Sequence, residues 1–348
     1  MATNIVVGLL FDFPQPDEGA SFEDDIRLGL DDVAALRGSS VDVELRREHA
    51  QGLPSGTPED LTAGFHALDE GGAAMVVGPS ISDNGVIARE LADAAGLACI
   101  NYTGGERTRS EWMFQYQVGS LEEEPPVLAR RLFERGVRRV AIVHDDSIVG
   151  DRYRECFGWA AASLGLDITS TRAISPTTDD VEAVVTELRA TEPAGLVYLG
   201  LGASSRAVAL TIIAAGWSIP VVANSALMFG YAKPDWRAAW AGWEYLDGIA
   251  DDNAVRRTLR EKSRRTAAGP IGCAAYDIGR LLGEAITRAD ATDRAGLKEG
   301  LERVKQLPAA SGVDGTTMGF GAWDRAALKG QYLVLREWRD DRSVQVAT

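Results

Sequence analysis

The chain has 348 residues, of which 45% are hydrophobic, and its formal net charge is −15 at pH 7. A single hydrophobic core stops growing at about 250–300 residues, so this length predicts two lobes rather than one. The acidic balance argues against a nucleic-acid partner, because a phosphate backbone would be repelled.

Short apolar runs alternate with amphipathic segments along the first part of the chain. The run Ile5–Phe11 predicts a strand, and Phe22, Ile26, Leu30 and Val33 then recur at helical spacing. The elements predicted after these are a strand at 41–45, a helix at 58–70, a strand at 73–77, a helix at 86–95 and a strand at 97–100. Strands separated by helices of about 10–15 residues predict parallel pairing through right-handed crossovers.

The same alternation restarts near residue 138. It predicts strands at 138–145, 166–174, 195–199 and 221–222, separated by helices at 150–164, 179–190 and 203–215. Residues 73–104 and 194–226 share one βαβ plan, in which the first strand ends at a glycine and the second at an asparagine. The sequence therefore predicts an α/β fold of two doubly wound parallel-sheet lobes, one resembling a copy of the other.

Ligands of open parallel sheets collect at the carboxyl ends of the strands. In this chain those ends are the loops 11–14, 78–84 and 101–105 in the first lobe, and 144–150, 200–205 and 224–228 in the second. The candidate ligand-binding residues in these loops are Phe11, Asp12, Phe13, Ser80, Ser82, Asn101, Tyr102, Thr103, Gly104, Val149, Gly150, Asn224, Ser225 and Met228. Two lobes that face each other would place both sets in one interdomain cleft.

Several candidates have a purely structural role open to them. Ser82 and Thr103 could bind a ligand carboxylate, or they could cap the helices that follow. Asp12 could meet a ligand amine or solvate its turn. Phe11 and Tyr102 could line a pocket or pack in a core.

Motifs for catalysis and metal binding do not occur in the sequence. It contains no GxxxxGK[ST], GxSxG, HExxH or SxxK, and Cys99, Cys156 and Cys273 form no CxxC. We therefore expect no catalytic residues, no metal and no cofactor. An enzyme with an unrecognised site is the alternative of a different class.

Six segments resemble, in the same order, those of the type I periplasmic solute-binding proteins. They are IVVGLLFDF, AMVVGPSIS, LACINYTGG, RRVAIVHDDSIVGDRYRECFGWAAASLG, CAAYDIGRLLGEAITRADATDRAGLKEGL and MGFGAWDRAALKGQYLVLREW. The subgroup is the Leu/Ile/Val-binding-protein-like receptors of ABC transporters, which includes amide- and urea-binding members. The resemblance implies a first lobe of residues 1–118 plus 249–325 and a second of 119–248 plus 326–348. Hinge crossings are then expected near 118, 248 and 326.

The resemblance also implies how a ligand is held. In the family, hydroxyls after the third and fourth strands hold the ligand's carboxylate and ammonium groups, and Ser80 or Ser82 and Thr103 resemble them here. This sequence departs from the pattern at Gly105, where a second hydroxyl is usual, and at Val149, where an aromatic usually precedes the glycine. The later loop 224–228 also lacks the family's acidic ammonium partner. We therefore expect an apolar or aromatic ligand with one carboxylate or amide.

The resemblance implies a non-catalytic binding protein that closes its lobes on a small molecule. Its expected protein partner is an ABC transporter permease, and the alternative is a cytosolic sensor of the amide-sensor kind that acts on a regulator. The N-terminal segment MATNIVVGLLFDF lacks a basic n-region, so we expect a cytoplasmic protein if the chain is complete. The alternative is a periplasmic or extracellular lipoprotein whose leader was removed. No apolar run has transmembrane length, so no direct membrane insertion is expected.

Overall fold

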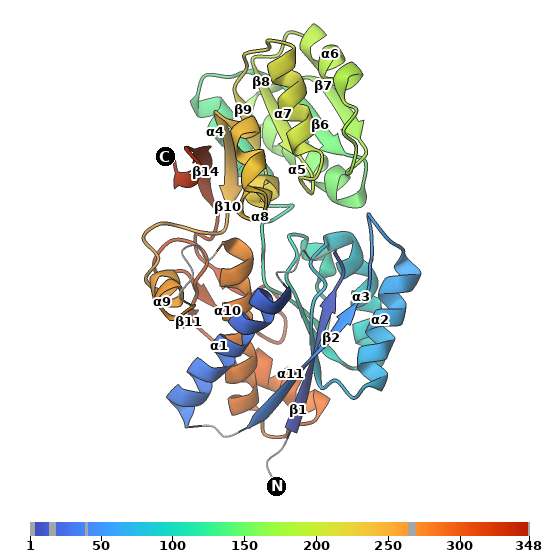
Figure 1. The fold of residues 1–348 in the computed structure, drawn as a ribbon, viewed down its shortest axis with the longest axis vertical. Helices are drawn as coiled ribbons and strands as arrows, with labels where there is room; N and C mark the ends of the chain where they lie inside the picture. The colour runs from blue at the N-terminus through green and yellow to red at the C-terminus, as the bar shows by residue number, and fades with distance from the viewer. Residues whose placement is uncertain (1–3, 14–18, 39–40, 264–268, 347–348) are drawn as a thin grey trace. The chain divides into compact units, whose positions relative to one another are not determined.

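The computed structural model describes residues 4–13, 19–38, 41–263 and 269–346. The chain divides into two compact units, each built from separate stretches of sequence (Figure 1). Unit 1 consists of Met1–Val118 and Ile249–Tyr332, and unit 2 of Gly119–Gly248 and Leu333–Thr348. The last predicted boundary, at 326, differs from this division. Residues 326–332 stay with unit 1 because Leu328 pairs with Met318 and the Val313 N–H donates to the Gln331 carbonyl at 3.0 Å.

Unit 1 contains a five-stranded sheet with the order β2-β1-β3-β4-β5, in which every pairing is parallel. Its first stretch holds β1 (Asn4–Phe11), α1 (Gly19–Arg37), β2 (Asp42–His49), α2 (Pro58–Glu70), β3 (Met75–Val77), α3 (Ser82–Ala95), β4 (Ala98–Asn101), the 3-10 turn η1 (Glu106–Thr108) and β5 (Met113–Gln115). Its second stretch holds α9 (Ala254–Ser263), α10 (Pro270–Arg288), α11 (Arg294–Glu302), β11 (Leu307–Pro308), β12 (Thr317–Met318) and β13 (Leu328–Lys329). The last three strands form a small antiparallel sheet.

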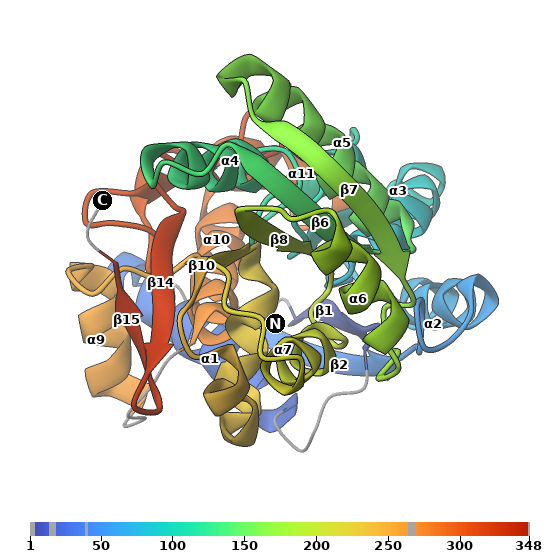
Figure 2. The same cartoon turned by 90° about the horizontal axis from the view of Figure 1, so that it is seen from above.

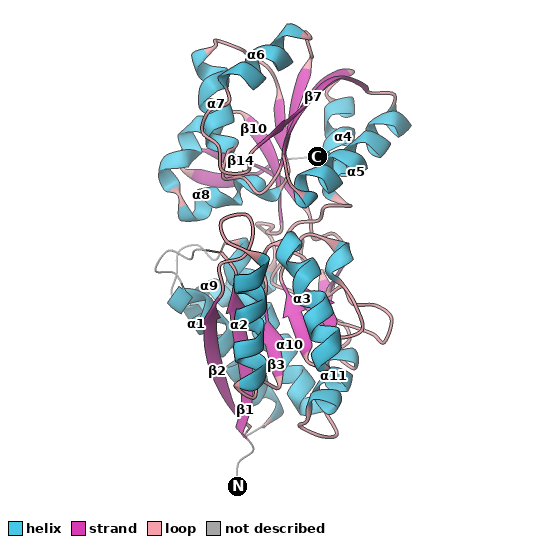
Figure 3. Ribbon diagram, turned by 90° about the vertical axis from the view of Figure 1, so that its right-hand side faces the viewer, coloured by secondary structure: helices cyan, strands magenta, loops and turns pink. Residues whose placement is uncertain are grey.

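Helices cover both faces of the unit 1 sheet. Figure 3 shows α2 and α3 side by side against the strands, and their apolar faces are buried there, including Leu61, Phe65 and Leu68 of α2. Figure 1 shows α1 and α10 on the other side of β1. These two helices pack closely because Gly29 and Gly279 have no side chain where they meet.

Unit 2 contains a seven-stranded sheet with the order β15-β14-β10-β9-β8-β6-β7. Its elements are α4 (Glu124–Glu134), β6 (Arg139–Asp145), α5 (Ile148–Leu164), β7 (Asp167–Ile174), α6 (Glu182–Ala190), β8 (Gly195–Leu199), α7 (Ser205–Ala214), β9 (Val221–Ala223), η2 (Ser225–Met228), α8 (Phe229–Ala232), η3 (Pro234–Trp240), β10 (Trp243–Asp247), β14 (Val334–Arg339) and β15 (Arg342–Gln345). The strands from β7 to β10 pair in parallel, and β14 and β15 join the edge in antiparallel fashion.

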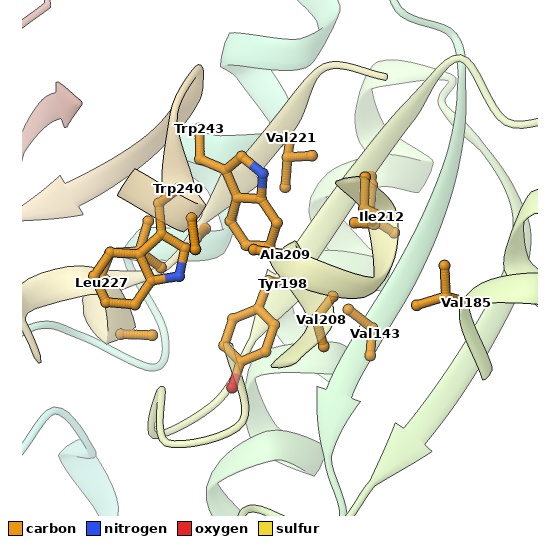
Figure 4. Close-up of a cluster of buried hydrophobic side chains, with 14 of the residues drawn as sticks. Val143, Val185, Tyr198, Val208, Ala209, Ile212, Val221, Leu227, Trp240 and Trp243 are labelled. Carbon is orange, nitrogen blue, oxygen red and sulfur yellow. The ribbon is translucent and has the colours of Figure 1, made fainter. Parts of the chain in front are cut away.

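The unit 2 sheet also lies between two helical layers. In Figure 2, α4 and α5 lie on one side of β6 and β7, and α6 and α7 lie on the other. A buried apolar cluster joins α6 and α7 to the sheet (Figure 4). In it, Tyr198 of β8 lies beside Val208 of α7, and its ring centroid is 6.4 Å from that of Trp243.

The two sheets share one strand order. The order β2-β1-β3-β4-β5 of unit 1 corresponds to β7-β6-β8-β9-β10 of unit 2. The two stretches that share a βαβ plan in the sequence are β3-α3-β4 and β8-α7-β9, which occupy corresponding places in these sheets. The predicted α/β fold with parallel-sheet lobes is therefore confirmed.

Candidate functional site

Asp12 follows β1 and is buried beneath the loop that follows β3. Its Oδ1 accepts the Ser80 backbone N–H at 2.8 Å and the Ser80 hydroxyl at 2.7 Å, while Oδ2 accepts the Ile81 N–H at 3.0 Å and Asn84 Nδ2 at 2.8 Å. Burial raises the pKa of Asp12, and these four hydrogen bonds oppose that rise. Each oxygen already accepts two donors, so the carboxylate anchors this loop and has no position left for a ligand amine.

Thr103 lies in a buried polar network rather than presenting its hydroxyl outward. It donates through Oγ1 to Asn101 Oδ1 at 2.8 Å, and its carbonyl accepts Gln115 Nε2 at 2.9 Å. Asn101 Nδ2 in turn donates to the Phe114 carbonyl at 3.1 Å and to Thr108 Oγ1 at 3.2 Å. The structure therefore uses Asn101 and Thr103 to hold the turn after β4, which gives Thr103 a structural role.

Ser82 begins α3 and differs from Thr103 in one respect that matters for binding. Its Oγ accepts the Gly105 N–H at 3.0 Å, and within the described ranges no acceptor takes its own proton. No side chain caps the start of α3, because the N-cap residue is Ile81. Phe13 and Gly104 lie half-buried in loops at the same edge of the sheet. Ser82 is therefore a predicted side chain of unit 1 that keeps a donor to offer.

The aromatic candidates of unit 1 pack around Phe22. The Phe11 ring meets Phe22 edge-on at 5.8 Å and stacks on His49 at 5.3 Å between ring centroids. Tyr102 lies 5.0 Å from the Phe22 ring, and burial, with the nearby charge of Asp12, raises the pKa of its hydroxyl. Phe11 and Tyr102 thus belong to the core, which is the simpler of their two predicted roles.

In unit 2, Asp145 corresponds to Asp12, the carboxylate that follows β1 in unit 1. It ends β6, accepts the Leu201 N–H at 2.6 Å and lies 3.3 Å from the Tyr198 hydroxyl and 3.4 Å from the Ser204 hydroxyl. A Cβ at Gly200 would overlap the Asp145 carboxylate. Both units therefore tie the loop after their third strand to an aspartate at the end of the first.

Val149 and Gly150 lie in the first turn of α5. A Cβ at Gly150 would overlap the Asp145 carbonyl oxygen, so glycine is required there. The Gly150 N–H donates to Ser147 Oγ at 3.0 Å, which caps the helix, and Val149 is buried. Both residues shape the start of α5.

Asn224 follows β9 and binds the loop beside it. Its side chain donates to the Gly200 carbonyl at 2.8 Å and accepts the Gly200 N–H at 3.2 Å. Met228 is half-buried at the end of η2. Asn224 therefore joins the two loops that follow β8 and β9.

Glu124 is a buried carboxyl group at this edge that the sequence did not single out. Its Oε1 accepts the Ser120 N–H at 2.6 Å, the Ser225 hydroxyl at 3.0 Å and the Tyr153 hydroxyl at 3.2 Å, while Oε2 accepts the Ser225 N–H at 2.6 Å. Burial raises the pKa of Glu124 to about 7, although the hydrogen bonds oppose it. In the sequence it resembles any acidic residue in a first helical turn before Pro125, so no local signal marks its burial.

The chain matches one known family over most of its length. The family described as periplasmic binding protein matches residues 17–334. The chain belongs to the periplasmic binding protein family. No curated protein matches it.

Solved structures of this fold cover almost the whole periplasmic binding protein. One is an ABC transporter substrate-binding protein from Desulfitobacterium hafniense in complex with Leu, with 19% identity, 99% of this chain and 100% of that chain covered, and a TM-score of 0.79. A leucine-binding protein from Thermotoga maritima has 13% identity, coverage of 99% and 98%, and a TM-score of 0.83. An ABC transporter solute-binding protein from R. palustris in complex with 4-hydroxybenzoate has 15% identity, coverage of 99% and 96%, and a TM-score of 0.80.

These matches confirm the resemblance to type I periplasmic, Leu/Ile/Val-binding-protein-like proteins. The family is one of binding proteins. The expectation of a cytoplasmic location finds no support in them, whereas the periplasmic or extracellular alternative is consistent with the family. Of the helices that the structure describes, none combines the length and apolarity needed to span a bilayer.

Proposed function

We propose that this periplasmic binding protein delivers a small molecule to an ABC transporter permease. Its ligand is held by residues at the carboxyl ends of the parallel strands in both units, and the units close on it. The observation that carries the proposal is which polar groups at these strand ends already form hydrogen bonds within the protein. Most of them fix the loops, and Ser82 at the start of α3 keeps a donor.

The ligand class follows from which polar groups at the strand ends remain available, and from whether these groups donate or accept hydrogen bonds. Asp12, Asp145 and Glu124 each accept several hydrogen bonds from the protein itself. The Ser82 hydroxyl and the backbone N–H groups that begin α3 are donors, which suit a carboxylate or amide oxygen. An apolar or aromatic monocarboxylate or amide therefore fits these residues better than a zwitterionic amino acid.

Closure requires that the ligand contact the closed state better than the open one, since equal affinity for both shifts nothing. Two of the similar solved structures contain a ligand, Leu in one and 4-hydroxybenzoate in the other. These complexes support a small organic ligand for a protein of this fold. The closed form is the state that we expect a permease to recognise.

A thermal-shift screen of the purified protein tests the proposal. The panel holds benzoate, 4-hydroxybenzoate, fatty acids, dicarboxylic acids, benzamide, urea and branched amino acids. A ligand at 100 times its dissociation constant adds about 2.7 kcal/mol to the free energy of unfolding, which such a screen detects easily. We expect a hit among the apolar or aromatic carboxylates or amides.

Two variants connect a hit to the site. Ser82→Ala should abolish or weaken the shift, whereas Ser218→Ala, at an exposed serine, should leave it unchanged. A hit confined to α-amino acids would contradict the ligand class and direct attention to Asp146, an exposed acid after β6. If no compound in the panel stabilised the protein, that result would count against the proposed ligand class.

A further inference from the structure

The hydrogen-bond donors around Glu124 are of two kinds, and only one kind can also act as an acceptor. Two are backbone N–H groups, from Ser120 and Ser225, and these can only donate. The other two are the hydroxyls of Ser225 and Tyr153, which can donate or accept. Three of the four donors converge on Oε1, so a proton on that oxygen would have to be accepted by one of the hydroxyls.

No positive side chain balances the charge of Glu124. Within the described part of the chain no lysine, arginine or histidine pairs with it. On α5, the titratable groups nearest in sequence to the contact are Tyr153 itself, Arg152 and Arg154. Arg152 is engaged by Glu122 at 3.0 Å and Glu155 at 2.9 Å, and Arg154 lies 3.4 Å from Asp151. On its other side, β9 and η2 bring no ionisable residue, and Glu123, the residue that precedes α4, is exposed.

We propose that Glu124 takes up a proton when unit 2 binds an anionic ligand. The protonated carboxyl of Glu124 then donates a hydrogen bond to the Ser225 or the Tyr153 hydroxyl. That hydroxyl no longer donates to Glu124, and it donates its own proton to the ligand instead. The inference rests on the proposed function, because it requires Ser225 to face the ligand. It makes Glu124 a positioning residue that sets the polarity of its neighbours.

The two states of Glu124 favour different ligands. When it is ionised, both hydroxyls point their protons inward and offer only lone pairs, which suits a ligand N–H. When it is protonated, one hydroxyl can donate, which suits a carboxylate. The raised pKa of Glu124, which burial places at about 7, makes both states accessible near neutral pH. Affinity for an anion should then fall about tenfold per pH unit above that value.

The protonation itself can be measured without any ligand. Infrared difference spectra of the wild type against Glu124→Gln, recorded from acid to alkaline pH, isolate the carboxyl band of this residue. We expect a protonated-carboxyl band that is lost as the pH rises through the neutral range. A matched pair of wild type and Glu123→Gln should show no such band, because Glu123 is exposed. A Glu124 that is ionised throughout would overturn the inference.

Probe binding tests the coupling. Benzoate and benzamide share a ring, and only benzoate is an anion, so their dissociation constants are compared by calorimetry at about pH 6 and about pH 9. Between these two pH values we expect the affinity of the wild type for benzoate to fall by a factor of about 100 and its affinity for benzamide to change little. Glu124→Gln should bind benzoate with the same affinity at both pH values. Benzoate binding that is equally strong at both pH values would overturn the inference while leaving the proposed function intact. If neither probe binds the wild type, the proposed ligand class fails, and the infrared titration decides the protonation of Glu124.

Discussion

Asp12 and Asp145 occupy the same place in the two units, at the end of the first central strand of each sheet. Each is buried and each accepts backbone and hydroxyl hydrogen bonds from the loop after the third strand. Burying a carboxylate is costly unless its lone pairs are satisfied, so these loops are held in one conformation. At the scale of single residues, much of the polar character at the strand ends serves this purpose.

Replacing Asp12 by asparagine should destabilise unit 1. The amide would keep one accepting oxygen, but its NH₂ group would face donors where the carboxylate accepted them. We expect a loss of about 2–3 kcal/mol in the free energy of unfolding, measured in urea. Asp31→Asn, at an exposed position of α1, is the control and should change little. Wild-type stability in Asp12→Asn would show that the loop does not depend on this charge.

Thr103→Val should also destabilise the free protein, because it removes the hydroxyl that Asn101 Oδ1 accepts at 2.8 Å. A buried acceptor left without that partner costs about 1–3 kcal/mol, visible as a lower urea midpoint. Thr103→Ser keeps the hydroxyl and should recover most of the loss. A Thr103→Val protein that is fully stable but has lost ligand affinity would instead restore Thr103 as a binding residue.

At the scale of elements, glycine decides how closely α1 and α10 pack. A Cβ at Gly29 would overlap the Tyr276 carbonyl oxygen, and one at Gly279 would overlap the Ile26 carbonyl oxygen. Each glycine thus faces the backbone of the other helix, where no side chain can move aside. The contact fixes α10, which belongs to the second stretch of unit 1, against the first stretch.

Gly279→Ala should therefore cost about 1–3 kcal/mol, because the two helices must separate to admit a methyl group. The matched control is Gly158→Ala in α5, where nothing lies within 4 Å of the added Cβ. There the better helix propensity of alanine should raise stability by about 0.5–1 kcal/mol. The melting temperature should fall in Gly279→Ala and rise in Gly158→Ala. A change in the same direction in both variants would contradict the close contact between α1 and α10 as the cause.

At the scale of the whole molecule, buried carboxyl groups connect distant parts of the chain. Asp277 of α10 accepts the Tyr116 hydroxyl at 2.7 Å and the Ala310 N–H at 2.7 Å, so it joins the two stretches of unit 1. Burial raises the pKa of Asp277 to about 6, with Arg280 opposing it. Glu124 connects two distant parts of one stretch of unit 2, near residues 120 and 225.

Both raised pKa values make stability depend on pH with the same sign. Each carboxyl binds its proton more tightly in the folded than in the unfolded chain, so its contribution is complete below about pH 4. That contribution is lost as the pH rises through about 6 for Asp277 and about 7 for Glu124. Each of these two rises in pKa corresponds to about 3 kcal/mol.

Urea unfolding at a series of pH values from about 4 to about 8 checks this expectation. The wild type should lose stability across the range from these two groups, and Asp277→Asn and Glu124→Gln should each lose less. Glu244 acts in the opposite direction, because its hydrogen bond to Arg131 lowers its pKa. Parallel pH profiles for the wild type and both variants would show that neither carboxyl has a raised pKa in the folded protein.

The sequence by itself determined the order of helices and strands, the parallel α/β architecture and the edge of each sheet where polar residues gather. Hydrophobic periodicity and strand-ending glycines are local signals, and they lie within a few residues of the element that they define. The strand ends 11–13, 101–104 and 224–225 could therefore be located without a structure.

Only the tertiary structure decided which of those polar groups are already engaged. Ser80 is bound by Asp12 from 68 positions away, and Ser225 by Glu124 from 101 positions away. Thr103 and Ser82 look alike in the sequence, yet the first donates to Asn101 and the second keeps its proton. A hydroxyl's availability depends on which partners the fold brings within about 3 Å, and that distance is set by chain segments far apart in sequence.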